Sequence, residues 1–329
     1  MRQKLFLHIG LHKTGSTSLQ KAFFDNRCEL ADLGVGYLAK KPNGDLGPSH
    51  NYLSYHDEPE RGARLFQPES LKAHLSELRQ PRLVLSTENF SWIFESSEVE
   101  KLQQVLSDYD VSVVMYLRRQ DQQAVSHFQE ASKWEVGRLK PAKKFYSLSE
   151  NRALPPIKPG KTSKYLDYFH RWKLWADAFG VENVRVKIFD RNQLVGGDVV
   201  TDFCSLIDLD WAPKDVASEN ISLGLSATKF GHLMTEVTGR IDSELELALR
   251  KAVSSSGKPA RPSRQQAQRF FSQFSESNRK LAQALQLDGE LFDSSFENYA
   301  EGPQDKWTED TANDTVRKIL QVLAQRYPS

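Results

Sequence analysis

Residues 5–20 read LFLHIGLHKTGSTSLQ, in which a short apolar run passes through a glycine-rich turn into a segment with helical spacing. Gly10 and Gly15 bracket the turn. Such a turn lets backbone N–H groups converge on an anion, and the helix start that follows adds unsatisfied donors and the positive end of its dipole. The stretch therefore predicts a phosphate-binding loop between a buried strand and a helix.

Apolar runs of strand length recur along the chain and alternate with segments of helical period. Strands are predicted over residues 4–9, 82–86, 111–117 and 184–189, and helices over 16–24, 122–134, 166–179 and 308–326. Each predicted strand is rich in Val, Ile, Leu or Phe, as strands buried on both faces are. The alternation predicts an α/β fold of P-loop type, with a central parallel sheet flanked by helices.

The alternation of strand-like and helix-like segments ends near Ser226, after which helical segments follow one another without a convincing strand. We therefore expect a single domain over residues 1–329, made of an α/β nucleotide-binding core at 1–225 and a helical C-terminal extension at 226–329. Stretches rich in proline, glycine or serine at 137–164 and 254–262 are predicted loops.

Composition excludes several functional classes. The 329 residues carry 44 Lys and Arg against 43 Asp and Glu, a net charge of +1, so no global field draws the chain to nucleic acid. The two cysteines favour neither a disulfide framework nor a cysteine-built metal site, and no apolar run reaches the roughly 18 residues of a membrane span. We expect a cytoplasmic protein without integral membrane association.

The predicted loop departs from that of nucleoside triphosphatases. In the pattern GxxxxGK[ST], Gly10 and Gly15 have the right separation, but Ser16 occupies the lysine position and Lys13 lies before the second glycine. The 111–117 strand ends in Arg118 and Arg119 rather than in a magnesium-holding carboxylate. These residues indicate a cofactor with two separate anionic centres that needs no metal ion.

Two motifs resemble those of the sulfotransferase superfamily that uses 3′-phosphoadenosine-5′-phosphosulfate (PAPS). KTGSTS at residues 13–18 resembles its 5′-phosphosulfate loop, and RRQDQQAVS at 118–126 resembles its 3′-phosphate motif. The blocks at 164–191, 196–209 and 219–226 resemble bacterial carbohydrate-type sulfotransferases. The resemblance implies transfer of a sulfuryl group from PAPS to a carbohydrate hydroxyl, leaving 3′-phosphoadenosine-5′-phosphate (PAP).

The resemblance also implies roles for individual residues. Lys13 would stabilise charge on the leaving phosphate, and Glu88, at the end of the 82–86 strand, would be the general base. Arg118 and Ser126 would bind the 3′-phosphate. The 5′-phosphosulfate would be wrapped by Lys13, Thr14, Gly15, Ser16, Thr17 and Ser18.

Contacts to the acceptor are harder to locate. Aromatic, polar and basic candidates are His50, Asn51, Trp92, Lys133 and Trp134, each of which alone is more commonly structural. Residues 138–164 carry eight Lys or Arg against one Glu, which fits either a flap for an anionic glycan or a solvated loop. The 254–264 loop either covers the 3′-phosphate or is simply exposed. His8 and His12 receive no role.

The predicted partner is a glycan or glycolipid, and an anionic one is included. A peripheral contact with a membrane would let the protein reach a lipid-linked acceptor. Two alternatives stay open. A magnesium-dependent P-loop kinase or triphosphatase would turn over ATP, whereas a non-catalytic nucleotide-binding protein would bind the cofactor without transferring sulfate.

Overall fold

The computed structural model describes residues 2–41, 43–55, 62–132, 153–156, 160–213, 223–237, 241–253 and 257–327. The chain divides into two units. The first comprises Met1–Arg118, Ser163–Glu219 and Ser277–Phe292, and the second comprises Arg119–Thr162, Asn220–Glu276 and Asp293–Ser329. The units interleave along the chain, so no single position such as 225/226 divides them. That the whole chain acts as one domain stays a prediction.

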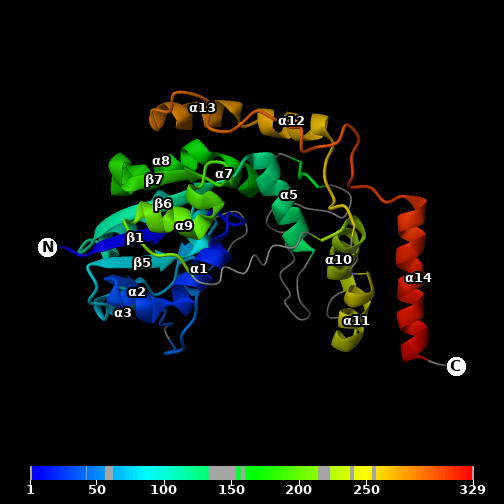
Figure 1. The fold of residues 1–329 in the computed structure, drawn as a ribbon, viewed down its shortest axis with the longest axis horizontal. Helices are drawn as coiled ribbons and strands as arrows, with labels where there is room; N and C mark the ends of the chain where they lie inside the picture. Colours follow the sequence, from blue (N-terminus) through cyan, green and yellow to red (C-terminus); the bar gives the residue numbers. More distant parts are fainter. Residues whose placement is uncertain are drawn as a thin grey trace. The chain divides into compact units, whose positions relative to one another are not determined.

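A five-stranded parallel sheet forms the centre of the first unit, in the order β2-β5-β1-β6-β7 (Figure 1). The strands are β1 (Lys4–His8), β2 (Val35–Tyr37), β5 (Arg82–Ser86), β6 (Asp110–Leu117) and β7 (Val184–Ile188). His8, the last residue of β1, lies opposite Ser86 of β5 and Val114 of β6. The α/β class predicted from the sequence is confirmed.

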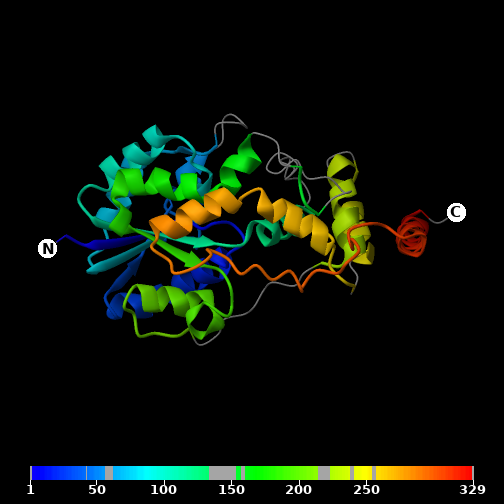
Figure 2. The same ribbon diagram turned by 90° about the horizontal axis from the view of Figure 1, so that it is seen from above.

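Helices cover both faces of this sheet (Figure 2). The first unit contains α1 (Ser16–Asp25), α2 (Arg27–Asp32), α3 (Pro68–Ser76), α4 (Ser96–Val105), α8 (Tyr168–Phe179), α9 (Val199–Leu206) and most of α7 (Lys161–Leu166) and α13 (Ser275–Ala284). One face packs Phe6, Val84 and Val114 against α1 and α9. The helices α4 and α8 contact each other, and α8 contacts β6 and β7.

A buried polar contact fixes α9 on the sheet. Asp202 of α9 accepts a hydrogen bond from the Tyr116 hydroxyl at 2.7 Å and pairs with Lys187 of β7 at 3.0 Å. The carboxylate is fully buried, so these two partners compensate its desolvation. As a result α9 is held close to the start of α1, where the predicted phosphate loop ends.

The predicted strands and helices fall within a few residues of the observed ones, but the sequence missed shorter elements. These are β2 and the small antiparallel pair of β3 (Ser54–Tyr55) and β4 (Arg64–Leu65), together with the 3₁₀ turns η1 (Asn51–Leu53), η2 (Glu88–Trp92), η3 (Val181–Asn183) and η4 (Val195–Gly197). Each of these spans five residues or fewer, too few for a period to appear. The sequence analysis also missed four helices of the first unit, α2, α3, α4 and α9.

In its described residues the second unit is helical. It contains α5 (Gln120–Ala131), α10 (Leu225–Val237), α11 (Ser243–Val253), α12 (Arg264–Ser272) and α14 (Glu309–Arg326). Phe230 and Met234 of α10 form one core with Leu245 and Leu249 of α11, against which Ile319 and Leu323 of α14 pack.

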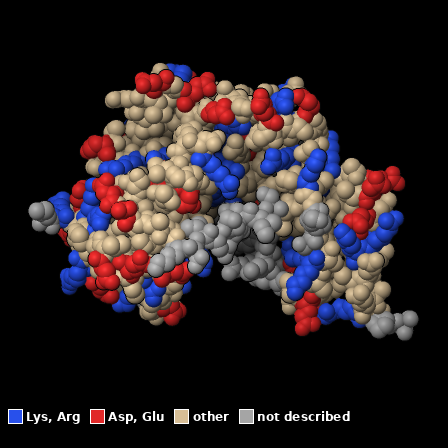
Figure 3. All heavy atoms as spheres, viewed as in Figure 1, with Lys and Arg blue, Asp and Glu red and all other residues tan. Residues whose placement is uncertain are grey.

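Charged residues of both signs are interspersed over the face of the first unit that Figure 3 shows. This agrees with the near balance of 44 basic and 43 acidic residues in the chain. In the described ranges no helix is both long and apolar enough to span a bilayer.

Candidate active site

The carboxyl ends of three neighbouring strands bring the predicted catalytic segments of the first unit together. β1 lies between β5 and β6, so the loop after β1 is flanked by the turn that begins at Glu88 and by Arg118 at the end of β6. Open parallel sheets bind their ligands at this edge, where strand order reverses. The sequence analysis placed each segment at the end of a predicted strand, and the sheet order shows that the three strand ends are neighbours.

The loop between β1 and α1 is held by its backbone. Leu11 N donates to Tyr116 O at 3.0 Å, and Tyr116 N donates to Gly10 O at 2.7 Å, so the loop continues the ladder with β6. The Thr14 hydroxyl is buried and donates to Leu11 O at 2.6 Å. Thr14 therefore shapes the loop, and its hydroxyl proton is already used there.

Gly15 ends the loop in the left-handed region, with φ of 80°, and caps α1 without a side chain. A Cβ at this position would lie 2.7 Å from Val199 Cγ1 and 3.2 Å from the Phe189 ring. Two separate constraints, positive φ and close packing against α9, thus require glycine here. The first N–H groups of α1 have no side-chain cap within the described residues, as an anion-binding helix start requires.

We expect Gly15→Ala to lower the free energy of unfolding by about 1–3 kcal/mol, because it adds left-handed strain and an overlap with Val199. Gly44→Ala is the matched control, since Gly44 has φ of 86° but nothing within 4 Å of the added Cβ. Urea unfolding of both variants measures the difference. Equal losses would show that packing against α9 does not constrain Gly15.

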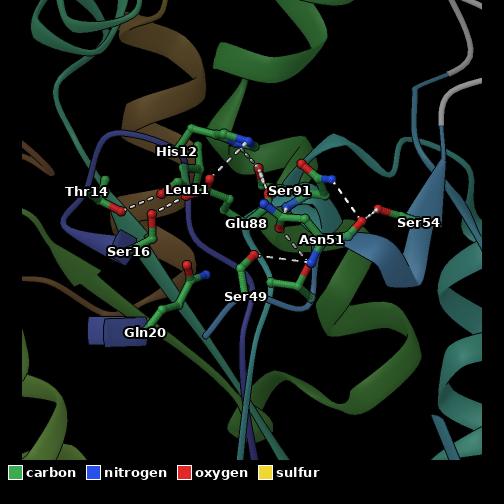
Figure 4. Close-up of polar contacts among 12 residues, drawn as sticks. Leu11, His12, Thr14, Ser16, Gln20, Ser49, Asn51, Ser54, Glu88 and Ser91 are labelled. Carbon is green, nitrogen blue, oxygen red and sulfur yellow. Dashed lines mark hydrogen bonds and ion pairs between the residues drawn. The ribbon is translucent and has the colours of Figure 1, made fainter. Parts of the chain in front are cut away.

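Glu88 lies at the first position of η2, directly after β5 and Thr87 (Figure 4). Its Oε2 accepts a hydrogen bond from the Ser16 hydroxyl of α1, and its Oε1 lies 3.9 Å from His12 Nε2. About 20% of the side chain is exposed, so the carboxylate can meet a ligand. Its position at the strand end matches the sequence expectation, and its role as base stays a prediction.

His12, to which the sequence assigned no role, lies beside Glu88. Burial lowers the pKa of His12. The negative charge of Glu88 raises this pKa, and the positive charge of Lys13 lowers it further. The signal was available in the chain order, because His12 immediately precedes Lys13 in the loop. Its partners Ser91 and Tyr165 come from distant segments that no spacing pattern connects to the loop.

The Arg118 side chain contacts the backbone of the loop at Lys13. Arg118 Nη1 donates to Lys13 O at 3.3 Å, and the guanidinium lies 5.8 Å from the centre of the Phe189 ring. The Tyr168 hydroxyl donates to Arg118 O at 2.7 Å, which fixes the end of β6. Lys13 itself has φ of 63° and is half-buried, as are Ser18 and Arg118, while Thr17 is exposed and Ser16 is buried.

Arg119 has its partners within the second unit. Its guanidinium is buried in the second unit, where Nε and Nη2 pair with Asp121 at 2.8 and 3.1 Å and the plane lies 4.1 Å from the Phe296 ring centre. The Arg119 guanidinium is therefore already paired with a carboxylate, and a role for it beside Arg118 stays a prediction. Ser126, on α5 of the same unit, is half-buried, and its 3′-phosphate role stays a prediction.

The predicted acceptor contacts have structural partners in the first unit. His50 is fully buried with Nδ1 2.8 Å from Ser86 O, and Asn51 Oδ1 accepts from the Thr87 hydroxyl at 3.1 Å. Trp92 is 2% exposed and stacks on Tyr165 with centroids 3.9 Å apart. In this arrangement neither His50 nor Trp92 offers a face to a ligand, and their acceptor roles stay predictions.

Several predicted features lie outside the described residues. Lys133 and Trp134 do, as do most of the basic 138–164 segment and residues 254–256 of the second loop. The described arginines of that loop bind within the second unit, Arg261 to Asn298 O at 3.0 Å and Arg264 to Glu301 at 2.6 Å. The described residues hold no group of three or more His, Cys, Asp or Glu side chains placed for a metal ion.

No protein-family model matches the chain. An uncharacterised protein from Archaeoglobus fulgidus is 28% identical over 166 residues, which make up 50% of this chain and 40% of that protein. The match thus spans less than half of that relative's length. The crystal structure of a sulfotransferase from Alicyclobacillus acidocaldarius covers 88% of this chain and 98% of its own, with 16% identity and a TM-score of 0.49.

Proposed function

We propose that this protein is a sulfotransferase that transfers a sulfuryl group from PAPS to a hydroxyl of a carbohydrate acceptor. The observation that carries the proposal is the convergence, at one sheet edge, of an anion-binding loop bearing Lys13, a strand-end Arg118 and the carboxylate of Glu88. When bound, PAPS supplies the activated sulfuryl group. The motif resemblance at residues 13–18 and 118–126 supports the choice of cofactor, and the carbohydrate acceptor rests on resemblance alone.

The residues present fit such a cofactor. The uncapped start of α1 and the positive backbone angles of Lys13 and Gly15 form a cradle for the 5′ anion. The planar fork of Arg118 suits the 3′-phosphate, with Ser126 as its second ligand by motif. An anion close to the Ser16 side chain is disfavoured, because the Ser16 hydroxyl already donates its hydrogen bond to the negatively charged carboxylate of Glu88. We therefore place the acceptor, and not the nucleotide, on the Glu88 side of the loop.

Each proposed role follows from the charge of the side chain. Glu88 accepts the proton of the acceptor hydroxyl, which makes the oxygen a better nucleophile. Lys13 stabilises negative charge that accumulates on the leaving phosphate as the S–O bond breaks. Arg118 holds the nucleotide in register and, through Lys13 O, steadies the loop. None of these roles uses a metal ion, and we propose cytoplasmic action on a glycan or glycolipid, with peripheral membrane contact where the acceptor is lipid-linked.

A second candidate function is favoured by one contact. In P-loop triphosphatases a loop hydroxyl and a carboxylate on a neighbouring strand together hold magnesium, and the pair of Ser16 and Glu88 has that character. Two features argue against it: Lys13 lies before the second glycine, and the strand on the other side of β1 ends in Arg118, which would repel a cation. A non-catalytic nucleotide-binding protein would also retain the loop.

Calorimetric titration with PAP in the absence of magnesium tests the proposal, with Mg-ATP as the competing ligand. We expect metal-independent binding of PAP that weakens about 10–100-fold in Arg118→Ala, since one or two charge-assisted hydrogen bonds are lost. Arg118→Lys is the matched control, because it keeps the charge but not the fork, and we expect an intermediate loss. Preference for Mg-ATP over PAP would instead support the phosphoryl-transfer alternative.

A further inference from the structure

His12 contacts two segments distant from it in the chain. It lies in the loop after β1; its Nδ1 is 3.2 Å from the Ser91 hydroxyl of η2 and 3.4 Å from the Tyr165 hydroxyl of α7. Its backbone N–H donates to the same Tyr165 hydroxyl at 3.1 Å. The ring is also 5.9 Å from that of Trp92, which stacks on Tyr165. His12 is therefore fixed on its Nδ1 side by the packing of η2 and α7.

The other edge of the ring faces Glu88. His12 Nε2 is 3.9 Å from Oε1, while the second carboxylate oxygen accepts the hydrogen bond of Ser16. The main chain of Glu88 is held as well, because the Ser91 hydroxyl donates to Glu88 O at 2.6 Å. The carboxylate thus lies between two residues of the phosphate loop region, one on each oxygen, as Figure 4 shows.

The charged groups that act on His12 lie on η2, in the loop and on α8. Glu88 of η2 raises the pKa of His12, as does a hydrogen bond that the Asn89 side chain accepts from the ring, whereas Lys13 of the loop and Arg171 of α8 lower it. Arg171 is buried beneath the rings of Tyr165 and Phe94, 5.3 Å from each centroid. Burial raises the pKa of Tyr165 to about 12, so its hydroxyl keeps its proton at neutral pH.

We propose that His12 is a positioning residue, whose Nε2 edge, together with the Ser16 hydroxyl, orients the carboxylate of Glu88 toward the acceptor. The inference rests on the proposed function, in which Glu88 is the base. In this arrangement the phosphate loop region has two roles. Its backbone binds the cofactor, and the side chains of His12 and Ser16 orient the carboxylate of the base. The cofactor site and the base therefore depend on the same segment of the chain.

Kinetics of His12 variants test this role, with PAP release from PAPS measured in the presence of pooled neutral and uronic-acid oligosaccharides. We expect His12→Ala to lower kcat about 30–100-fold, the scale for a misplaced reacting group, while the Kd for PAP changes less than about 3-fold. His12→Gln places an amide near the position of Nε2, so we expect kcat within about 5-fold of wild type. His12→Asn places its amide near Nδ1 and is expected to behave like His12→Ala.

Three outcomes would overturn the inference. Wild-type kcat in His12→Ala would show that the contact is unimportant. A His12→Gln variant as slow as His12→Ala would show that the imidazole itself transfers the proton. Loss of PAP binding in parallel with kcat would make His12 a cofactor ligand. Should His12→Ala fail to fold in a thermal melt, the comparison of His12→Gln with His12→Asn still decides, because both retain a polar side chain.

An NMR titration, which needs no turnover, distinguishes a failure of this inference from a failure of the proposed function. The His12 imidazole is titrated by NMR in wild type and in Glu88→Gln, with its signal assigned from the spectrum of His12→Gln. Because the Glu88 charge raises the pKa of His12, we expect its removal to shift the His12 titration to lower pH. An unchanged titration overturns the pairing. A shifted titration with full activity in Glu88→Gln overturns instead the role of Glu88 as base.

Discussion

Glu88→Gln is expected to lower the rate of sulfuryl transfer by about 10²–10⁴-fold, the range for removal of a general base. The amide keeps an oxygen that can accept from Ser16 and keeps the shape that packs against the loop, but it cannot take a proton. Binding of PAP should therefore be unchanged. Steady-state kinetics of PAP release, together with calorimetric titration of PAP, measures the two quantities separately.

Two controls make the Glu88→Gln result interpretable. Glu100→Gln removes the same charge from an exposed position on α4 and should leave both kcat and PAP binding unaltered. Glu88→Asp keeps the carboxylate but retracts it, and we expect an intermediate kcat. If Glu88→Gln were as active as wild type, another group would accept the proton of the acceptor hydroxyl. Glu88 would then have a structural role only, as the acceptor of the Ser16 hydrogen bond.

The parts of the site that sequence could predict are those fixed by chain order and strand ends. A run such as residues 4–9 must be a buried strand, and in a parallel sheet its carboxyl end meets the ends of its neighbours. This places Lys13, Glu88 and Arg118 at one edge before any coordinate is known. The three residues lie close together only if the 82–86 and 111–117 strands lie on either side of the first strand, and β5 and β6 do lie on either side of β1.

The parts that sequence missed depend on contacts between distant segments. Tyr165 approaches His12 across 153 residues, and Tyr299 donates to Asp121 across 178. No local period encodes such pairs, because side-chain packing determines them only after the sheet and helices have assembled. Arg119 shows the same limit: the motif placed it next to Arg118, and its burial against Asp121 and Phe296 could be found only from the packed structure.

Acid destabilisation is the second large effect we expect, and it originates at the ends of β1 and β5, next to the loop between β1 and α1. His8 at the end of β1 has Nδ1 2.8 Å from the Ser86 hydroxyl, and His50 has Nδ1 2.8 Å from Ser86 O, both fully buried. Burial lowers the pKa of His8 to about 4 and that of His50 to about 4, from the ordinary value of 6.5. Both rings are therefore neutral in the folded protein at pH 7.

The sign of the effect follows from proton binding. Between pH 6.5 and 4 the unfolded chain binds a proton at each histidine that the folded protein excludes, so stability falls as pH falls through this window. At about 1.4 kcal/mol for each pH unit, each histidine removes about 3 kcal/mol by pH 4. Above pH 6.5 neither state is protonated there, and the contribution disappears.

Urea unfolding at several values between pH 7 and pH 4.5, followed by tryptophan fluorescence, measures this loss, since Trp92 and Trp175 are buried in the same unit as both histidines. His8→Gln and His50→Gln should each be less stable at pH 7, because packing is lost, yet each should show a shallower dependence on pH than wild type. His170→Gln, which makes the same substitution at an exposed position of α8, is the control. A wild-type slope in both buried variants would mean that other groups drive acid unfolding. A shallower slope would show that the polar contacts around Ser86, at the base of the site, hold only while these two rings are uncharged.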